Sequence, residues 1–508
     1  MLASRRMRLG VVGAGTMGTG IAQLAAQSGL RTLLHDADPA ALQGALGRLD
    51  ALVERGKLDA EARARVEPVA VLDALAPCEA VIEAAPEDLA LKRALLGRLA
   101  EVVGEACLLA TNTSSLSVTA IAAAVARPER VAGMHFFNPP ALMRLVEVVA
   151  GDATAPETVA RARALAEAMG RHVIEAADGP GFLVNRCNRP FGLEAMRLVQ
   201  ERVATPEQVD RVCRLAGGFR MGPFELMDLV GIDVGLTISE SFFAQSYGEP
   251  RWRPSPLAAR LVAAGRLGRK SGRGWHAYPP GPPADPVPPE PGGGDGRLVV
   301  IAGDGTVAWE LREAAADAGW DVADPAEAEG EVPELILDCG AEEDDAPMQG
   351  AHQLILCDAA PLAALDPGGS TAGFHVLPPL GRLVELTAQP STAAGALPAA
   401  EAFFATLGMV AERVGDGPGL VLGRIVAQLV NEAAFALGEG VGSAADIDAG
   451  MELGLNHPRG PLAWADAIGP AAVLSILAGL EHEHREERYR PAPALMRAVR
   501  SDLPMTTV

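Results

Sequence analysis

The stretch RLGVVGAGTMGTGIAQLAAQSG, residues 8–29, joins a short apolar run, a glycine-rich turn and an Ala-rich helical segment. In a Gly-x-Gly-x-x-Gly turn, the first glycine allows the tight turn, the second lets a pyrophosphate approach the backbone, and the third permits close packing of helix on strand. The N-terminus of the helix then faces the phosphates. The residues predicted to hold a dinucleotide are Gly13, Gly15, Thr16, Met17 and Gly18.

An acidic residue at the end of the next apolar run bears on the choice of coenzyme. RTLLHD ends at Asp36, 23 positions after Gly13, and no arginine follows it directly. A carboxylate at this place accepts hydrogen bonds from both ribose hydroxyls, whereas it would repel a 2′-phosphate. The pattern therefore favours NAD over NADP. The alternative is an ordinary tight turn between a strand and a helix.

Strand-like and helical stretches alternate in the first part of the chain. RLGVV, RTLLHD, AVIEAA, CLLATN, RVAGMHF and RHVIEA are strand-like runs, and Ala- and Leu-rich helical stretches separate them. This alternation is typical of a parallel α/β sheet. From residue 181 to about 277, the pattern turns helical without a convincing strand.

Motifs from the first half return in the second half. The segment PPGPPADPVPPEPGGGDG, residues 279–296, is a linker, because its Pro and Gly prevent regular structure. DGPGFLVNR (178–186) returns after it as DGPGLVLGR (416–424), and MGPFELMDLVG (221–231) returns as RGPLAWADAIG (459–469). Because the repeated motifs occur in the same order in both halves, they indicate a duplication.

The fold class predicted from these patterns is a Rossmann-type α/β parallel sheet followed by an all-α domain, and then a degenerate repeat of both. The second copy is shorter and has lost about one or two strand–helix pairs. The predicted division is a Rossmann domain at 1–180, a helical domain at 181–278, the linker at 279–296, a reduced Rossmann-like domain at 297–415 and a second helical domain at 416–508.

Composition narrows the class of protein. The chain has 508 residues, of which 49% are hydrophobic and 21% are charged, as expected of several globular domains. The net charge of -22 repels nucleic acid and anionic membranes, so neither is an expected partner. No apolar run approaches the roughly 20 residues of a membrane span, and no signal peptide is recognised. The six cysteines lack metal-ligand spacing, so we expect no metal site and a cytoplasmic protein.

Two polar motifs follow strand-like runs. His135 precedes Glu147 by twelve residues. A histidine of near-neutral pKa can take a hydroxyl proton, and a carboxylate on its other ring nitrogen fixes the tautomer. The alternative is a core histidine and an exposed glutamate. TNTSSL (111–116) is expected at the carboxyl edge of the sheet, where it could hold a substrate hydroxyl and the nicotinamide, and a capped turn is its alternative.

Residues 8–278 resemble the L-3-hydroxyacyl-CoA dehydrogenase family, of the 3-hydroxybutyryl-CoA dehydrogenase type. The resemblance rests on VIEAAPEDLALKRALL, TNTSSLS, HFFNPP, LVEVV, DGPGFLVNR, GPFELMDLVG and LGRKSGRGWHAY. The second copy resembles the reduced Rossmann segment and extra helical domain of longer bacterial members, including those assigned to phenylacetate catabolism.

This resemblance implies oxidation of (S)-3-hydroxyacyl-CoA by NAD to 3-oxoacyl-CoA and NADH. It implies that His135 is the general base and Glu147 its partner, that Ser114 hydrogen-bonds the 3-hydroxyl or 3-keto oxygen, and that Asn185 completes the site. The other positions implied are Glu87, Lys92 and Asn112 near the nicotinamide and its ribose, and Asn138 and Lys57 on the substrate side. For Lys57, which matches a coenzyme A position, the alternative is a solvated surface lysine.

The second copy retains only part of this set. His375 and Glu385 repeat the pair, but CDAAP replaces TNTSS, Gly423 replaces Asn185, and Ala308 replaces the third glycine. We expect no NAD turnover there. The family's helical domains pair, so we expect residues 419–508 to act as an internal pseudo-dimer partner, with a homo-oligomer left open.

Alternatives to this function are a non-catalytic dinucleotide-binding protein and a dehydrogenase of free 3-hydroxy acids. Within the acyl-CoA chemistry, the substrate is 3-hydroxybutyryl-CoA or 3-hydroxyadipyl-CoA, in fatty acid or phenylacetate degradation, and the tandem architecture favours the latter by analogy.

Overall fold

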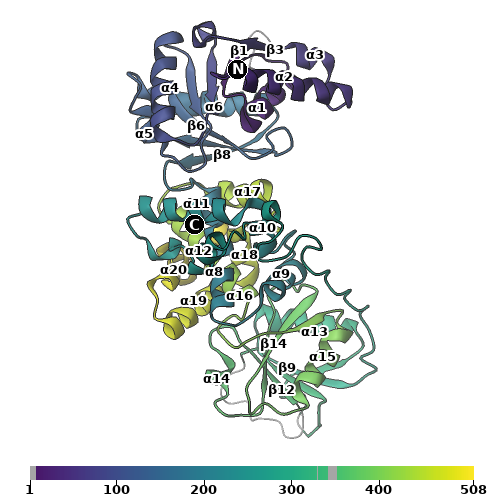
Figure 1. Ribbon diagram of the computed structural model, residues 1–508. Coiled ribbons are helices and arrows are strands. Elements are labelled where there is room, and N and C mark those ends of the chain that lie inside the picture. The colour runs from purple at the N-terminus through teal and green to yellow at the C-terminus, as the bar shows by residue number, and fades with distance from the viewer. Residues whose placement is uncertain (1–6, 329, 341–351, 508) are drawn as a thin grey trace. The chain divides into compact units, whose positions relative to one another are not determined.

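The computed structural model describes residues 7–328, 330–340 and 352–507. The chain forms two compact units, of which the first comprises Met1–Cys187 with Glu439–Leu455, and the second comprises Asn188–Gly438 with Asn456–Val508 (Figure 1). This partition follows packing rather than chain order. The five-part division made from the sequence stays a prediction.

The first unit contains an eight-stranded sheet in the order β3-β2-β1-β4-β5-β6-β7-β8. Its strands are β1 (Arg8–Val12), β2 (Arg31–His35), β3 (Val66–Val69), β4 (Ala80–Glu83), β5 (Leu108–Thr111), β6 (Val131–Phe136), β7 (Leu145–Ala150) and β8 (His172–Ala177). All neighbours run parallel except β6 and β7, which are antiparallel. The predicted Rossmann-type sheet is confirmed, whereas β3 and β7 were not predicted as strands and the sheet is not wholly parallel.

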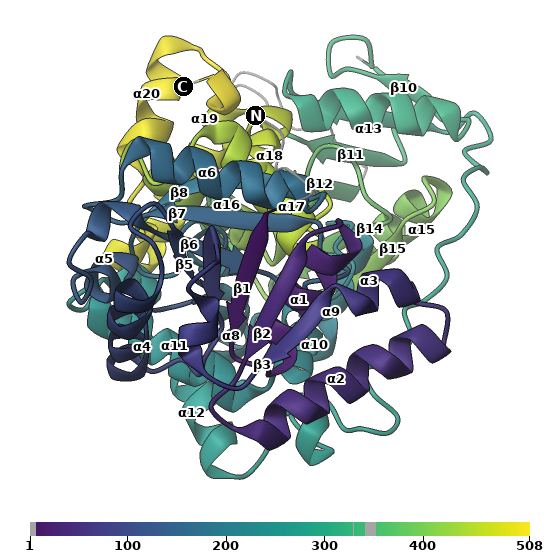
Figure 2. The ribbon, with the colours of Figure 1, turned by 90° about the horizontal axis from the view of Figure 1, so that it is seen from above.

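Helices cover both faces of this sheet (Figure 2). They are α1 (Thr16–Gln27), α2 (Pro39–Glu54), α3 (Ala60–Ala64), α4 (Leu89–Val102), α5 (Val118–Ala122), α6 (Pro156–Ala168), α7 (Val184–Cys187) and α17 (Ala444–Leu455). One apolar core lies between the strands and α1 and α6, and another lies between the strands and α4 and α5. Asp88 caps α4 by accepting from Leu91 N at 2.8 Å, which fixes where that helix begins.

The second unit combines helices from both copies with a second sheet. The helices are α8 (Arg189–Gln200), α9 (Pro206–Leu215), α10 (Pro223–Val230), α11 (Ile232–Gln245), α12 (Pro256–Ala263), α16 (Leu422–Gly438), α18 (Pro461–Ile468), α19 (Pro470–His484) and α20 (Pro493–Ser501). The described residues between 181 and 278 form no strand of the named sheets, as predicted.

The second sheet repeats the plan of the first on a smaller scale. Its described strands have the order β10-β9-β11-β12-β13-β14-β15. They are β9 (Leu298–Ala302), β10 (Asp321–Ala323), β11 (Leu335–Asp338), β12 (His352–Leu356), β13 (Ala372–His375), β14 (Leu383–Ala388) and β15 (Val410–Arg413), with α13 (Thr306–Asp317), α14 (Leu362–Leu365) and α15 (Ala396–Thr406). Only β13 and β14 are antiparallel, as β6 and β7 are in the first sheet. Within the described ranges, this sheet has no counterpart of β3.

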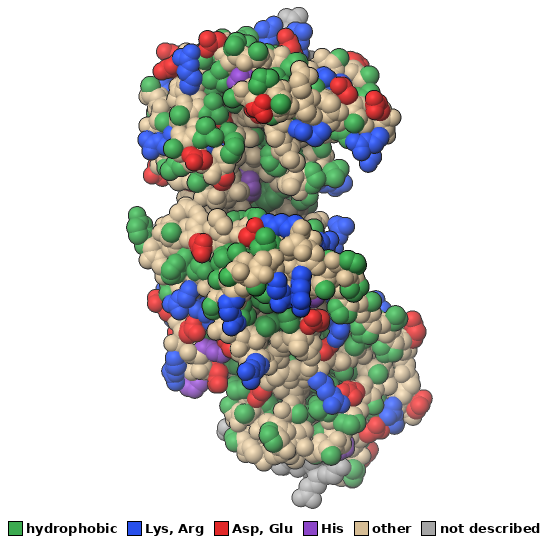
Figure 3. Space-filling model, viewed as in Figure 1, with side chains coloured by type: hydrophobic (Ala, Val, Ile, Leu, Met, Phe, Trp, Pro, Cys, Tyr) green, Lys and Arg blue, Asp and Glu red, His purple; other side chains and the backbone are tan. Residues whose placement is uncertain are grey.

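Within the second unit, α8 of the first copy packs against α16 of the second. Arg424 of α16 is buried there and donates to Glu194 of α8, to Glu201 Oε2 at 2.6 Å and to Tyr489 Oη at 2.7 Å. Burial would lower the pKa of Arg424, but the charges of the two carboxylates raise it instead. On the face shown in Figure 3, charged groups of both signs are spread among apolar and uncharged ones.

No single described helix is long and apolar enough to cross a membrane. The helices α18 and α19 reach that length and composition only as a pair, which is bent by 100°.

Candidate active site

The predicted site residues of the first copy gather at one edge of the first sheet. The carboxyl ends of the parallel strands β1, β4, β5 and β6 meet there, and the strand order reverses at β1, which lies between β2 and β4. Ligands of open α/β sheets bind at such a switch point. The glycine turn follows β1 directly, so the fold places it at this edge.

Each of the three positions in the turn is occupied by glycine for a different structural reason. Gly13 has a φ of +102°, and a Cβ added to it would lie 2.5 Å from Ala84 O. A Cβ on Gly18 would lie 1.7 Å from Gly13 O. Gly15 has nothing within 4 Å of its Cβ position, and it is the N-cap of α1. The fold therefore requires Gly13 and Gly18, whereas Gly15 leaves open space before the helix amides, which fits a pyrophosphate.

Asp36 joins the end of β2 to this turn. Its Oδ2 accepts from Ala14 N at 2.6 Å, and its Oδ1 accepts from Asp38 N at 2.9 Å. The carboxylate thus lies beside the glycine turn, as a ribose-binding acid must. Arg48 of α2, which sequence reasoning missed, donates to Ala14 O at 2.7 Å. Arg48 also donates to Thr19 Oγ1 at 2.9 Å, and neither a backbone carbonyl nor a threonine hydroxyl is recognisable in the sequence as its partner.

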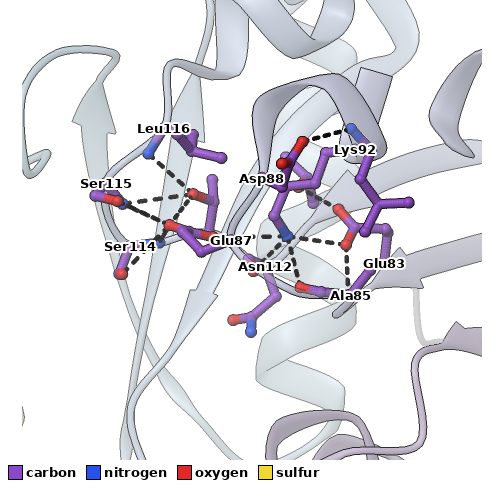
Figure 4. Close-up of polar contacts among 12 residues, drawn as sticks. Glu83, Ala85, Glu87, Asp88, Lys92, Asn112, Ser114, Ser115 and Leu116 are labelled. Atoms are coloured by element: carbon purple, nitrogen blue, oxygen red, sulfur yellow. Dashed lines mark hydrogen bonds and ion pairs between the residues drawn. The ribbon is translucent and has the colours of Figure 1, made fainter. Parts of the chain in front are cut away.

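Lys92 joins the loops that follow β4 and β5 (Figure 4). Its side chain is wholly buried, and Nζ donates to Glu83 Oε1 at 2.8 Å, Ala85 O at 3.2 Å and Asn112 O at 3.3 Å. Glu83 also accepts from Thr111 Oγ1 at 2.6 Å. A buried ion pair of this kind is tolerated only when its remaining polar atoms are satisfied. Glu83 ends β4 and was missed because it reads as part of an apolar strand.

Glu87 holds the loop after β5 (Figure 4). Its Oε1 accepts from Thr113 Oγ1 at 2.6 Å and from the amides of Ser114 and Ser115, both at 3.0 Å. Burial by itself would raise the pKa of Glu87, but these hydrogen bonds and the charge of Lys92 bring it below its ordinary value. The carboxylate is therefore ionised at neutral pH and fixes the loop that carries Ser114.

Three elements converge around Ser114. Asn112 accepts from Phe136 N at 2.9 Å through Oδ1, which ties the loop after β5 to the end of β6. Asn185 of α7 donates from Nδ2 to Ser114 O at 3.4 Å. Ser114 is half-buried. The structure therefore brings Ser114 and Asn185 together, although 71 positions separate them in the sequence.

His135 and Glu147 face each other across the antiparallel strands β6 and β7. They are directly opposite in register, and His135 Nδ1 lies 2.6 Å from Glu147 Oε2. Cross-strand neighbours of this kind have adjacent side chains. Both residues are buried, with 7% of His135 exposed and none of Glu147. The alternative of a core histidine with an exposed glutamate is therefore wrong.

The second oxygen of Glu147 is also held. Its Oε1 accepts from Leu183 N at 3.1 Å and from Val184 N at 3.0 Å, the amides that begin α7. The ring of Phe137 packs 4.6 Å from the ring of His135. With Nδ1 engaged by Glu147, Nε2 is the nitrogen of His135 available to a substrate proton.

Two predicted substrate residues have exposed side chains. Lys57 follows α2 and Asn138 follows β6. No interaction between described residues joins either of them to His135 or Ser114. Their roles stay predictions.

Comparison with known proteins decides the family. The model of the 3-hydroxyacyl-CoA dehydrogenase NAD-binding domain matches residues 8–179, and that of the C-terminal domain matches residues 181–278 and 419–506. The chain belongs to the 3-hydroxyacyl-CoA dehydrogenase family. The predicted family, NAD as coenzyme and the class of oxidoreductase are confirmed.

Individual relatives differ in length. This dehydrogenase is 38% identical to a 3-hydroxyadipyl-CoA dehydrogenase of Escherichia coli over 96% of each chain. It is 42% identical to a probable 3-hydroxybutyryl-CoA dehydrogenase of Deinococcus radiodurans over 54% of this chain and 100% of the relative. A crystal structure of 3-hydroxybutyryl-CoA dehydrogenase from Escherichia coli matches with a TM-score of 0.83 at 36% identity, over 98% of this chain and 99% of that one.

The second copy repeats the frame of the pair. His375 and Glu385 are opposite in register on β13 and β14, and Glu385 accepts from Val421 N at 2.7 Å and Leu422 N at 3.0 Å. Glu147 likewise accepts from two successive amides, but both bond its Oε1, whereas here each oxygen of Glu385 takes one amide, and His375 Nδ1 lies 3.7 Å from Glu385 Oε1.

The surroundings of His375 differ from those of His135. Its Nε2 lies 3.0 Å from Asp358 Oδ1, and a Cβ on Gly423 would lie 2.5 Å from the ring. Burial would lower the pKa of His375, but Asp358 and Glu385 raise it to about 9. A buried imidazolium between two carboxylates cannot accept a proton at neutral pH. This supports the prediction that the second copy turns over no NAD.

Substitutions of Gly15 and Gly18 should affect different properties, coenzyme binding in the first case and stability in the second. Gly15→Ala should keep the melting temperature of the enzyme, because its Cβ meets no atom, but should weaken NADH binding by more than about tenfold, because the methyl enters the pyrophosphate space. Gly18→Ala should lower the melting temperature instead, because its methyl overlaps Gly13 O. Calorimetry and NADH fluorescence titration measure both effects. Unchanged NADH affinity in Gly15→Ala would contradict the assignment.

His375 should make stability depend on pH. Its folded pKa of about 9 lies above the ordinary histidine value of 6.5, so its contribution to stability is complete below about pH 6.5 and is lost as the pH rises through about 9. The difference in unfolding free energy between wild type and His375→Gln should therefore shrink by up to about 3 kcal/mol over this window. Urea unfolding at each pH measures it. A constant difference would mean that His375 is neutral in the folded enzyme.

Proposed function

We propose that this enzyme oxidises (S)-3-hydroxyacyl-CoA with NAD at the first-copy site, with His135 as the general base and Glu147 as its partner. The observation that carries the proposal is the 2.6 Å contact between His135 Nδ1 and Glu147 Oε2, together with the two backbone amides that hold the other oxygen of Glu147. Glu147 is thereby fixed at both oxygens, so it orients the imidazole before substrate arrives.

We assign each residue of the site a separate role in the oxidation of the substrate. His135 Nε2 takes the proton of the substrate 3-hydroxyl, and Glu147 stabilises the imidazolium that forms. NAD, when bound, supplies the nicotinamide that accepts the hydride from C3. Ser114 and Asn185 lie together and orient the 3-oxygen. In the reverse direction, protonated His135 returns its proton to the forming alkoxide.

The coenzyme is held by groups at the same edge. We assign the pyrophosphate to the turn from Gly13 to Gly18, and the adenine ribose to Asp36. Glu87 and Asn112 are assigned to the nicotinamide side, where Lys92 contacts both residues: Nζ donates to Asn112 O at 3.3 Å and lies 3.7 Å from Glu87 Oε2. Lys92 is wholly buried, so its role is to position these loops rather than to contact the coenzyme.

Two other functions have less support. A non-catalytic dinucleotide-binding protein would have no need for a buried His–Glu pair with both carboxylate oxygens engaged. A dehydrogenase of free 3-hydroxy acids would act without the CoA moiety, and activity on free acids would revive that alternative.

We further propose 3-hydroxyadipyl-CoA as the preferred substrate. The support is the relative of that name, which matches nearly the full length of both chains, whereas relatives named 3-hydroxybutyryl-CoA dehydrogenase include ones that match about half of this chain. A crystal structure that matches nearly the full length is named as a 3-hydroxybutyryl-CoA dehydrogenase. Activity measured on both substrates therefore decides between them.

Two finer proposals concern assembly and location. The packing of α8 on α16 supports residues 419–508 as an internal partner of the first helical domain. The six cysteines have free thiols, which supports a reducing compartment such as the cytoplasm.

The reaction is tested with acetoacetyl-CoA and NADH. We expect rapid oxidation of NADH, little of NADPH because Asp36 repels a 2′-phosphate, and a loss of roughly 10²–10⁴-fold in kcat for His135→Ala. NADH affinity of the variant, measured by fluorescence, should be unchanged. Full activity of His135→Ala would remove His135 from the mechanism.

Substrate preference is tested separately, by kcat/KM for 3-hydroxyadipyl-CoA against (S)-3-hydroxybutyryl-CoA. We expect the six-carbon dicarboxylic thioester to be preferred by about tenfold or more, the equivalent of about 1.4 kcal/mol or more in the transition state. Equal or reversed values would assign the enzyme to the shorter substrate.

A further inference from the structure

One helix of the second copy belongs to the compact unit of the first. The segment Glu439–Leu455, which contains α17, lies more than 250 residues after Asn185, yet it packs in the first unit. Figure 2 shows α17 beside β7 and β8. Its packing partners are β7, β8 and α7, the elements that carry or anchor Glu147.

Two polar contacts tie this segment to the first domain. Ala177 N at the end of β8 donates to Val441 O at 2.8 Å. Glu439 Oε2 lies 2.8 Å from Arg186 Nη2, and only 6% of the Arg186 side chain is exposed. Arg186 follows Asn185 directly, so this ion pair anchors α7 next to a proposed active-site residue.

Glycines on the buried face of α17 allow close approach. A Cβ on Gly450 would lie 2.8 Å from Val184 Cγ2 and 3.0 Å from Ile174 Cδ1. A Cβ on Gly454 would lie 2.8 Å from Leu145 Cδ2 and 3.4 Å from the ring of Phe137. The helix therefore contacts the first domain at distances that leave no room for a larger side chain.

The side chains that α17 contacts belong to the supports of the His–Glu pair. Val184 donates its amide to Glu147 Oε1 at 3.0 Å, and Phe137 packs its ring 4.6 Å from that of His135. Gly450 fits against the first of these supports and Gly454 against the second. A displacement of α7 or of Phe137 would move the carboxylate or the imidazole.

We propose that α17 is a positioning element of the first active site, so that the second copy, although its own pair is sealed, sets the geometry of the working pair. The inference rests on the proposed roles of His135 and Glu147. It goes beyond pairing of the two helical domains, because the partner of α17 is the NAD-binding domain. Gly450 is the positioning residue that tests it.

The experiment compares three variants of the full-length enzyme. Gly450→Val presses on Val184, Gly450→Ala is the conservative change, and Ala445→Val places the same β-branched side chain on the exposed face of the same helix. Each is assayed for kcat and KM with acetoacetyl-CoA and for NADH affinity by fluorescence, and the folded fraction is measured by circular dichroism.

We expect kcat of Gly450→Val, per folded molecule, to fall by about 10- to 100-fold, because a misplacement near 1 Å has such an effect on reacting groups. NADH affinity should be unchanged, since the glycine turn follows β1 and α17 packs on β7, β8 and α7. Gly450→Ala should recover most of the rate, and Ala445→Val should behave as wild type. A purely structural role would lower the melting temperature and leave kcat per folded molecule unchanged.

The outcomes separate this inference from the proposed function. Loss of activity in His135→Ala with normal kcat in Gly450→Val would overturn the role of α17 alone. Normal activity in His135→Ala would overturn the proposed role of His135, on which the role of α17 rests. Should Gly450→Val fail to fold, Glu439→Gln removes the partner of Arg186 from outside the helix, and normal kcat in that variant would equally overturn the role of α17.

Discussion

The register between β6 and β7 is the constraint on which the active site depends. It places His135 opposite Glu147, where side chains of one face are neighbours. The same carboxylate then accepts the two amides that begin α7, so the position of Asn185 follows from the position of Glu147. A slip of one residue would turn these side chains to opposite faces of the sheet. The sheet therefore sets which two residues meet, and α7 and Phe137 hold them in place.

The second copy shows that this frame and the chemistry are separable. β13 and β14 keep the register and the paired amides, but Asp358 and Gly423 stand where the first copy has Asn112 and Asn185. Loss of the asparagine side chain leaves space that His375 fills, and the added carboxylate holds it charged. The duplicated sheet thus keeps the strand register of the first copy, while the residues around the histidine differ.

Buried cations organise both units. Lys92 joins the loops after β4 and β5 in the first, and Arg424 joins α8 to α16 in the second. Each is paired with carboxylates and further hydrogen-bonded, as burial of a charge requires. Removing one partner would leave an uncompensated charge, so such clusters tie distant segments together. In the second unit, the segments tied are helices from the two copies.

Much of the site followed from the sequence alone. Local motifs predicted the βα turn at Gly13, the acid at Asp36 and the candidate pair His135 and Glu147, because these depend on short-range backbone geometry and spacing. The duplication was predicted from motifs that return in the second half of the chain. Only the tertiary structure decided that LVEVV is a strand antiparallel to β6, that Glu83 pairs with Lys92, and that α17 joins the first domain. Each of these depends on contacts between residues that are distant in the chain. Local sequence patterns do not identify which distant residue a side chain or a helix face will contact.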